Sequence, residues 1–125
     1  MQRDEFMLTT CSAEKDPAAG LLRADERYSC ARVQRVREAA RERGLPLLFL
    51  SGVFGIVRAS EPLPLYDHAL QPEEVEELTA RAIRSLRELG VRRLHLCLRE
   101  RSTAGWAPYY AVLDAAAGAL DLDVV

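Results

Sequence analysis

The residues best suited to chemistry lie together near the amino terminus, in the segment TTCSAEK at positions 9 to 15. It combines hydroxyls, a thiol, a carboxylate and an amine. A thiol or hydroxyl becomes a nucleophile beside a base, and a nearby ammonium lowers the pKa of a thiol. We predict ligand-binding roles for Thr10, Cys11 and Ser12, and a catalytic role for Lys15. The alternative is a turn rich in Ser and Thr whose hydroxyls satisfy backbone groups, with Cys11 as a small buried side chain.

Lys15 is set apart by composition. The chain has 17 Lys and Arg residues, of which Lys15 is the single lysine, and it contains no Asn. Lysine can lose its proton and act as a base or nucleophile, whereas arginine stays charged. An arginine-biased sequence that retains one lysine therefore favours a position where an amine is needed. A single lysine left on a loop by chance is the alternative.

A second segment, SGVFG at positions 51 to 55, follows the apolar run PLLFL. Its glycines would let backbone amides approach an anion, as anion-binding loops require. We predict ligand-binding roles for Ser51, Gly52 and Gly55. The segment lacks the full Walker and dinucleotide patterns. The alternative is that both glycines only permit a tight turn.

A third segment, PLPLYDH, supplies a ring and a carboxylate on a rigid loop. Tyr66 could stack on a base, and Asp67 could accept a proton or pair with a ring nitrogen, so Asp67 is the second predicted catalytic residue. Tyr28 and Arg32, near the start of a helix, are predicted ligand-binding residues, because a guanidinium suits phosphate or carboxylate. The alternatives are that Asp67 only makes a hydrogen bond that holds its loop in place, and that Arg32 is an ordinary arginine on the surface of the helix.

No metal or cofactor is predicted. His68 with Cys11 and Cys30 matches no zinc spacing. For Trp106 and Tyr109, packing of the last helix is favoured over lining a pocket.

The hydrophobic pattern predicts elements that alternate along the chain. Strands are expected at 5–10, 46–50, 93–98 and 122–125, and helices at 28–43, 72–89 and 108–120. Pro62 and Pro64 exclude a helix from 56–70, most of which is expected to be an ordered loop. The alternation predicts a single α/β domain over residues 1–125, a three-layer fold with a mainly parallel sheet of about four strands and helices on both faces. Ligands of such sheets bind beyond the carboxyl ends of the strands, where residues 9–15, 51–55 and 99–105 should converge.

The composition limits which partners the protein can bind and in which cellular compartment we expect it. At 49% hydrophobic and 29% charged residues the chain is of ordinary globular type, and its longest apolar run, Leu45 to Leu50, is too short to span a membrane. The acidic start MQRDEF is unlike a secretory signal, and the three cysteines lack CxxC spacing, so we expect a cytoplasmic protein with at least one free thiol. A net charge of -2 gives no overall attraction to nucleic acid. The oligomeric state stays open.

The ordered set TTCSAEKD, RYxxxR, LSGVFGIV and PLPLYDH resembles a family of small bacterial and phage proteins that carry CSxxK, LSGKFGL-like and PxYD segments in this order. More distantly, the chain is similar to the YaaA peroxide-stress proteins and to the uracil-DNA-glycosylase-like domain of archaeosine transglycosylase relatives. The resemblance implies a link to nucleobases or nucleic acid through the matching positions, among them Ser12, Lys15 and Asp67. Val53 departs from the family's usual Lys in the turn, and Cys30 from its usual Ser before the helix arginine.

Two function classes follow. The first is a domain that binds a nucleobase, nucleoside or nucleotide, with N-glycosidic or related hydrolytic chemistry. The second is a non-catalytic DNA-binding or oxidative-stress-response module that uses the arginine-rich first helix, whose binding would weaken steeply with salt.

Overall fold

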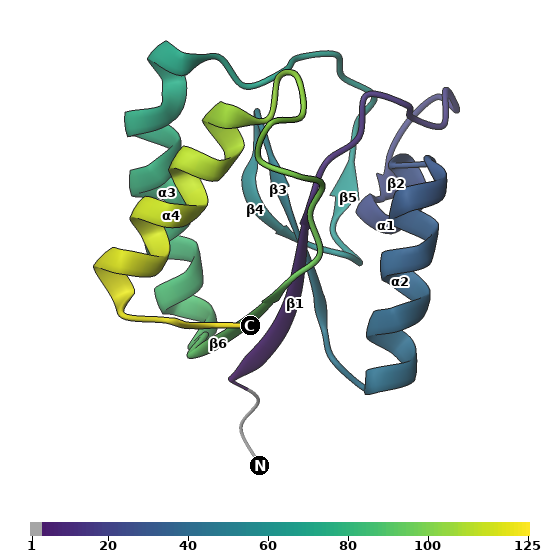
Figure 1. Ribbon diagram of the computed structural model, residues 1–125. Coiled ribbons are helices and arrows are strands. Elements are labelled where there is room, and N and C mark those ends of the chain that lie inside the picture. The colour runs from purple at the N-terminus through teal and green to yellow at the C-terminus, as the bar shows by residue number, and fades with distance from the viewer. Residues whose placement is uncertain (1–3) are drawn as a thin grey trace.

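A computed structural model describes residues 4–125. In this range the chain forms a mixed α/β fold with a five-stranded, mostly parallel sheet and four α-helices (Figure 1). The α/β prediction with a mainly parallel sheet is therefore confirmed. The prediction about export depends in part on residues 1–3, which lie outside the described residues.

The five-stranded sheet runs in the spatial order β4-β3-β1-β6-β7. Its strands are β1 (Glu5–Thr10), β3 (Leu47–Ser51), β4 (Gly55–Arg58), β6 (Arg93–Leu96) and β7 (Asp123–Val124). β1 pairs in parallel with β3 and with β6, and only β4 is antiparallel to its neighbour. The carboxyl ends of β1, β3 and β6 consequently lie along one edge, which is the upper edge in Figure 1.

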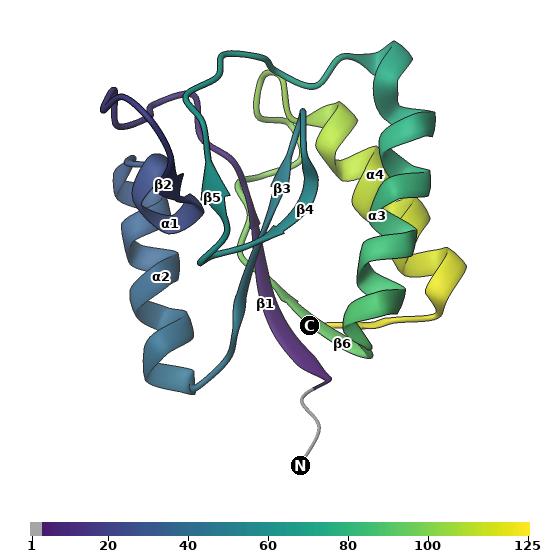
Figure 2. The same cartoon turned by 180° about the vertical axis from the view of Figure 1, so that it is seen from behind.

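The helices lie on both sides of this sheet. They are α1 (Ala24–Arg27), α2 (Ala31–Arg43), α3 (Val75–Leu89), which follows the 3-10 turn η1 (Pro72–Glu74), and α4 (Ala107–Leu120). α1 and α2 stand on one side and α3 and α4 on the other, as both views show (Figures 1 and 2). α2 and α3 end where expected, at Gly44 and Gly90, because each glycine adopts a left-handed conformation with φ of 66° and 72°.

Alternation along the strands divides the apolar core into two clusters. Successive side chains of a strand point to opposite faces. Phe6, Leu8 and Leu50 therefore pack with α3 and α4, whereas Met7 and Phe49 pack with α2. All of these strand residues are buried, so the central strands are covered on both faces.

The stretch after the second predicted strand differs from expectation. Gly55–Arg58 is strand β4, which pairs with β3 in a tight hairpin, so the sheet gains a strand that the prediction of a mostly looped 56–70 omitted. Pro62–Leu63 forms the short strand β5, paired with β2 (Leu22–Arg23). Prolines exclude a helix but tolerate short edge strands, which is why the loop prediction for this stretch was wrong in part.

Two element boundaries also differ. α2 begins at Ala31 rather than at Tyr28, because Tyr28 forms an isolated antiparallel bridge with Lys15. β6 ends at Leu96 rather than at Leu98. In residues 4–125 no helix has both the length and the apolar character needed to cross a membrane.

Candidate functional site

A cavity of about 200 Å³ lies beyond the carboxyl end of β1. Three segments that are distant in sequence form its walls: the loop after β1, the loop before η1, and the turn into α4. The lining residues are Thr10, Cys11, Ser12, Ala13, Lys15, Asp67, His68, Ala69, Ala104, Gly105, Trp106 and Tyr109. The parallel sheet brings the first and the third of these segments together, because the carboxyl ends of β1 and β6 share one edge. The loop before η1 follows β5 of the separate two-stranded sheet.

Thr10 is the last residue of β1, and its hydroxyl has no partner within the part of the chain that the structure describes. Its side chain is only 1% exposed, and its Oγ1 makes no hydrogen bond in the described part of the chain. Thr9, which points to the other face, instead donates to the carbonyl of Cys97 at 2.7 Å. An unpaired buried hydroxyl costs stability. The unpaired hydroxyl thus belongs to a residue that lines the cavity, although the oxygen itself is buried.

Lys15 is held in a fixed place on the cavity wall. Its Nζ donates a hydrogen bond to the carbonyl oxygen of Ser12 at 2.7 Å and lies 4.6 Å from the centroid of the Tyr66 ring. Its backbone is anchored by the bridge to Tyr28. The turn just before Lys15 is tight, because the Ser12 hydroxyl donates to the carbonyl of Glu14 at 2.5 Å. The ammonium group is thus positioned by backbone and by an aromatic face.

Behind Lys15 lies a chain of hydroxyls. Tyr66 Oη is 2.5 Å from Tyr28 Oη and 2.8 Å from Ser51 Oγ. Burial is the main cause that raises the pKa of Tyr28 to about 12 and also raises the pKa of Tyr66. Both phenols therefore stay protonated at neutral pH.

Ser51 also organises the turn that follows β3. Its Oγ accepts hydrogen bonds from the amides of Val53 and Phe54, at 3.2 and 3.1 Å. These two N–H groups are occupied inside the turn, so they do not serve the anion cradle that the glycines suggested.

Cys11 and Tyr109 meet at the inner wall. The Cys11 thiol donates to Tyr109 Oη at 3.6 Å, and the same oxygen accepts the backbone amide of Leu70 at 3.1 Å. Burial is the main cause that raises the pKa of Tyr109. The phenol of Tyr109 thereby ties α4 to the loop that carries Asp67.

Arg32 supports the wall without lining it. Its guanidinium donates to Thr9 Oγ1 at 2.5 Å and to the carbonyls of Thr10 and Cys11 at 3.3 and 3.2 Å. It also lies 5.1 Å from the centre of the Trp106 ring. Burial lowers the pKa of Arg32 from a very high starting value. The arginine fixes the carboxyl end of β1 and one face of Trp106.

The structure thus separates the predicted site residues into three groups. Thr10, Cys11, Ser12, Lys15 and Asp67 line the cavity itself. The supporting residues lie behind or beside it and are Tyr28, Arg32, Ser51 and Tyr66. The two glycines lie elsewhere: Gly52 lines a neighbouring hollow, and Gly55 opens β4.

Some cavity residues were not among the predicted ligand-binding positions. Trp106 and Tyr109 were expected to pack the last helix, and Tyr109 does belong to the apolar cluster with α3 and α4, yet both also line the cavity. His68 and Gly105 line it as well. The expected convergence of the loop after the third strand was the signal that pointed to this wall.

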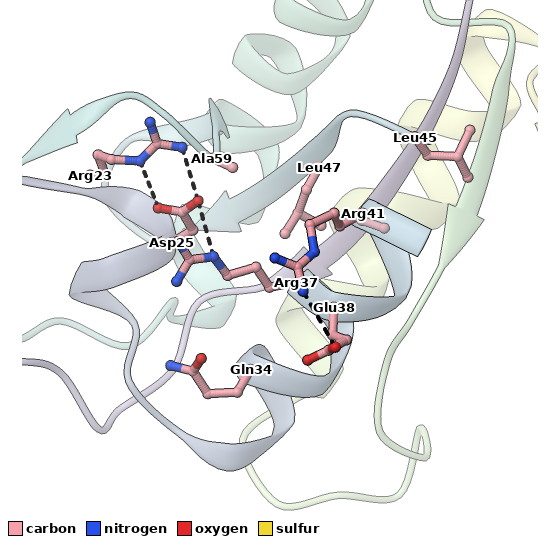
Figure 3. Close-up of a pocket in the computed structure, with 10 residues that line it drawn as sticks. Arg23, Asp25, Gln34, Arg37, Glu38, Arg41, Leu45, Leu47 and Ala59 are labelled. Carbon is pink, nitrogen blue, oxygen red and sulfur yellow. Dashed lines mark hydrogen bonds and ion pairs between the residues drawn. The ribbon is translucent and has the colours of Figure 1, made fainter. Parts of the chain in front are cut away.

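A larger hollow, of about 540 Å³, lies on the α2 side near the start of β3. Figure 3 shows Arg23, Asp25 and Arg37 on its wall, with the Asp25 carboxylate between the two guanidinium groups. Asp25 is 4% exposed and lies 3.1 Å from Arg23 Nε and 3.4 Å from Arg37 Nε. Arg41 pairs with Glu38 at 3.4 Å. These charges pair with one another, and the ion pairs of Asp25 form a brace between α2 and the segment before it.

Within residues 4–125, no group of three or more His, Cys, Asp or Glu side chains could hold a metal ion. The three cysteines are free thiols, which confirms the prediction of at least one free thiol. No protein-family model, curated protein or solved structure matches the chain.

Proposed function

We propose that the cavity beyond β1 binds a nucleobase-type ligand, the base of a nucleoside or nucleotide, and hydrolyses its N-glycosidic bond. One observation carries the proposal: Lys15 and Asp67, which lie 52 positions apart in the sequence, line the same small cavity. A volume of about 200 Å³ lies below the roughly 300–1,000 Å³ of pockets for drug-sized ligands, and so favours a single ring system. The Trp106 indole on the wall offers an aromatic surface for such a ring.

The two charged groups suit hydrolysis. Water would attack the anomeric carbon while the carbon–nitrogen bond breaks. Asp67, which has no hydrogen-bond or ion-pair partner in the described chain, would take the proton of the water. The departing ring nitrogen would receive a proton from the Lys15 ammonium. Tyr66 acts as a positioning residue here, because its ring lies against Lys15 Nζ.

The test replaces Lys15 with Arg and measures nucleoside hydrolysis by chromatography. Arginine keeps the positive charge but cannot release its proton to the leaving base, so turnover should fall by about 10²- to 10⁴-fold. Asp67→Asn should lower turnover similarly. The midpoint of thermal unfolding should stay unchanged in both variants.

Glu14→Gln provides a matched control in the same loop, since the Glu14 side chain is exposed and does not line the cavity. Its activity should equal that of the wild type. Unchanged ligand binding and turnover in Lys15→Arg would remove Lys15 from the mechanism and leave the proposal without its main support.

The DNA-binding alternative has less support, because the arginines of α2 are largely engaged within the protein. Arg32 contacts the end of β1, Arg37 contacts Asp25, and Arg43 contacts His95. Few of these cations remain for phosphates.

We propose in addition that the chain is a single three-layer domain and that it functions in the cytoplasm. The two apolar clusters, one with α2 and one with α3 and α4, support the layered arrangement. Three free thiols suit a reducing compartment. We also propose that the chain is related to the families that its sequence resembles.

A further inference from the structure

Three arginines gather on the α2 side of the sheet. Arg32 and Arg35 line a hollow of about 300 Å³ between α2 and residues 96–98, at the end of β6 and just beyond it. Arg99 directly follows Leu98, which lines the same hollow. Burial is the main cause that lowers the pKa of Arg32, and the charges of Arg99 and Arg35 lower it further. The three guanidinium groups are therefore close enough to repel one another.

No carboxylate among residues 4–125 pairs with this cluster. The side chains of Arg35 and Arg99 are exposed and make no hydrogen bond or ion pair within the described chain. Glu38, three residues after Arg35 on α2, pairs with Arg41 instead. The hydrogen bonds of Arg32 all go to uncharged oxygens. The positive charge at this place is consequently not compensated by the part of the protein that the structure describes.

This cluster differs from the brace around Asp25. There a buried carboxylate lies between Arg23 and Arg37, so the like charges are held together by an opposite one. At Arg32, Arg35 and Arg99 the same kind of charges meet without an opposite charge. Like charges held close together cost stability, and a bound anion would remove that cost.

The hollow also offers apolar surface beside these charges. Val36, Leu96 and Leu98 line it, together with Ala39 and Cys97. A guanidinium group forms paired hydrogen bonds with the oxygens of a phosphate, and a phosphate monoester carries close to two negative charges. A carboxylate carries one charge and a phosphodiester likewise. The monoester therefore balances three arginines better than either, and an apolar group attached to it would lie on the apolar residues.

We infer that this hollow is an anion site that binds a small phosphate monoester, with Arg32, Arg35 and Arg99 around the phosphate and an apolar group against Val36, Leu96 and Leu98. The site is separate from the cavity beyond β1, and the inference does not depend on the proposed function. It assigns binding roles to Arg35 and Arg99, which have no partner in the described chain.

Nuclear magnetic resonance titration of the arginine Nε–Hε signals tests the inference at pH 8 and constant ionic strength. The probes are phenyl phosphate, inorganic phosphate, dimethyl phosphate and acetate. Phenyl phosphate should bind most tightly, at least about threefold more tightly than inorganic phosphate because its ring covers apolar surface. Dimethyl phosphate and acetate, with one charge each, should bind more weakly still.

Arg35→Gln and Arg99→Gln should each weaken phenyl phosphate by about two- to fivefold, as expected for an exposed charge pair, and the double variant by about four- to twentyfold. Without phosphate, the midpoint of thermal unfolding should be unchanged or higher in these variants, because repulsion is removed. A loss of affinity would then not come from unfolding. Arg32 is left unchanged, since it holds the carboxyl end of β1.

Arg84→Gln is the matched control. Arg84 is equally exposed and unpaired in the described chain, but it belongs to α3 on the opposite side of the sheet. Its replacement removes the same charge and should leave the affinity for phenyl phosphate unchanged.

The inference would be overturned by wild-type affinity in the double variant, or by an equal loss of affinity in Arg84→Gln. Acetate or dimethyl phosphate binding as tightly as phenyl phosphate would overturn the assignment of a monoester. Inorganic phosphate binding as tightly would overturn the role of the apolar residues. None of these results bears on nucleoside hydrolysis in the cavity, which is measured separately.

Discussion

Gly52 shows how tightly single residues are packed beside the cavity. Its backbone is not in the left-handed region, so its conformation alone does not require glycine. A Cβ at this position would, however, lie 3.0 Å from the amide nitrogen of Leu70 and 3.1 Å from Tyr109 Oη. The hydrogen bond between these two atoms ties the Asp67 loop to α4. Glycine is needed here for close approach, and the contact holds two cavity walls together.

We therefore expect Gly52→Ala to destabilise the protein by about 1–3 kcal/mol, as overpacking does, and to weaken ligand binding because the Asp67 loop must shift. Urea denaturation and calorimetric titration measure the two effects. Gly118→Ala is the matched control, since a Cβ there meets open space on α4. This control should be neutral or stabilising by up to about 1 kcal/mol. Equal stability of the two variants would contradict the packing argument.

At the scale of elements, Asp25 connects α1 to its neighbours. Its carboxylate accepts two hydrogen bonds from Arg23 of β2, each of 3.1 Å, and lies beside Arg37 of α2. α2 in turn carries Arg32, which holds the carboxyl end of β1. The brace drawn in Figure 3 therefore helps to position the helix that supports the cavity wall.

Asp25→Asn keeps the shape of this side chain but removes the buried charge that Arg23 and Arg37 share, and leaves Arg23 with the more exposed Glu26 at 3.8 Å. We expect a loss of about 1–2 kcal/mol in the free energy of unfolding, because hydrogen bonds to charged groups contribute amounts of this size and both arginines are half-exposed. Glu38→Gln removes a fully surface pair with Arg41 and should change stability by less than about 0.5 kcal/mol. Urea denaturation of both variants makes the comparison, and a larger effect at Glu38 would count against the brace.

At the scale of the whole molecule, the buried tyrosine hydroxyls make the free energy of unfolding depend on pH in the alkaline range. The pKa of Tyr28 rises from 10.0 to about 12, and those of Tyr66 and Tyr109 rise as well, in each case first because of burial. A raised pKa means that the folded state keeps its proton while the unfolded state loses it. The stability contributed by these tyrosines is thus fully present below pH 10 and is lost as the pH rises through the folded pKa.

The free energy of unfolding should accordingly fall between pH 10 and about 12, by up to about 1.4 kcal/mol per pH unit for each tyrosine involved. Urea denaturation at a series of pH values measures the slope. In Tyr28→Phe the slope should be smaller by the share of one tyrosine, even though the variant loses the hydrogen bond to Tyr66. A stability independent of pH above 10 would show that the phenols ionise as freely in the folded state as in the unfolded one.

Local patterns in the sequence were sufficient for most of the elements. The continuous apolar run before Ser51 predicted β3, the helical spacing from Val75 to Leu89 predicted α3, and Gly44 and Gly90 predicted the ends of two helices. These features depend on neighbours in sequence, which a single chain displays directly. The strand β4 was missed because it depends on pairing with β3, which the sequence does not show directly. The prolines that follow it also favoured the prediction of a loop.

For the candidate site, too, some features could be predicted from the sequence and others depended on the tertiary structure. The residue types at Thr10, Lys15 and Asp67, and the rule that ligands bind beyond parallel strands, led to the prediction of a site at this edge, where the structure has a cavity that these residues line. Only the tertiary structure could place Trp106 and Tyr109 on its wall, since their helical spacing is equally compatible with core packing. Only the tertiary structure could leave Thr10 Oγ1 without a partner among residues 4–125 while it paired the turn amides with Ser51. The side chain determines which hydrogen-bond donors and acceptors a residue has. Whether they stay unpaired depends on which distant groups the fold brings within hydrogen-bonding distance.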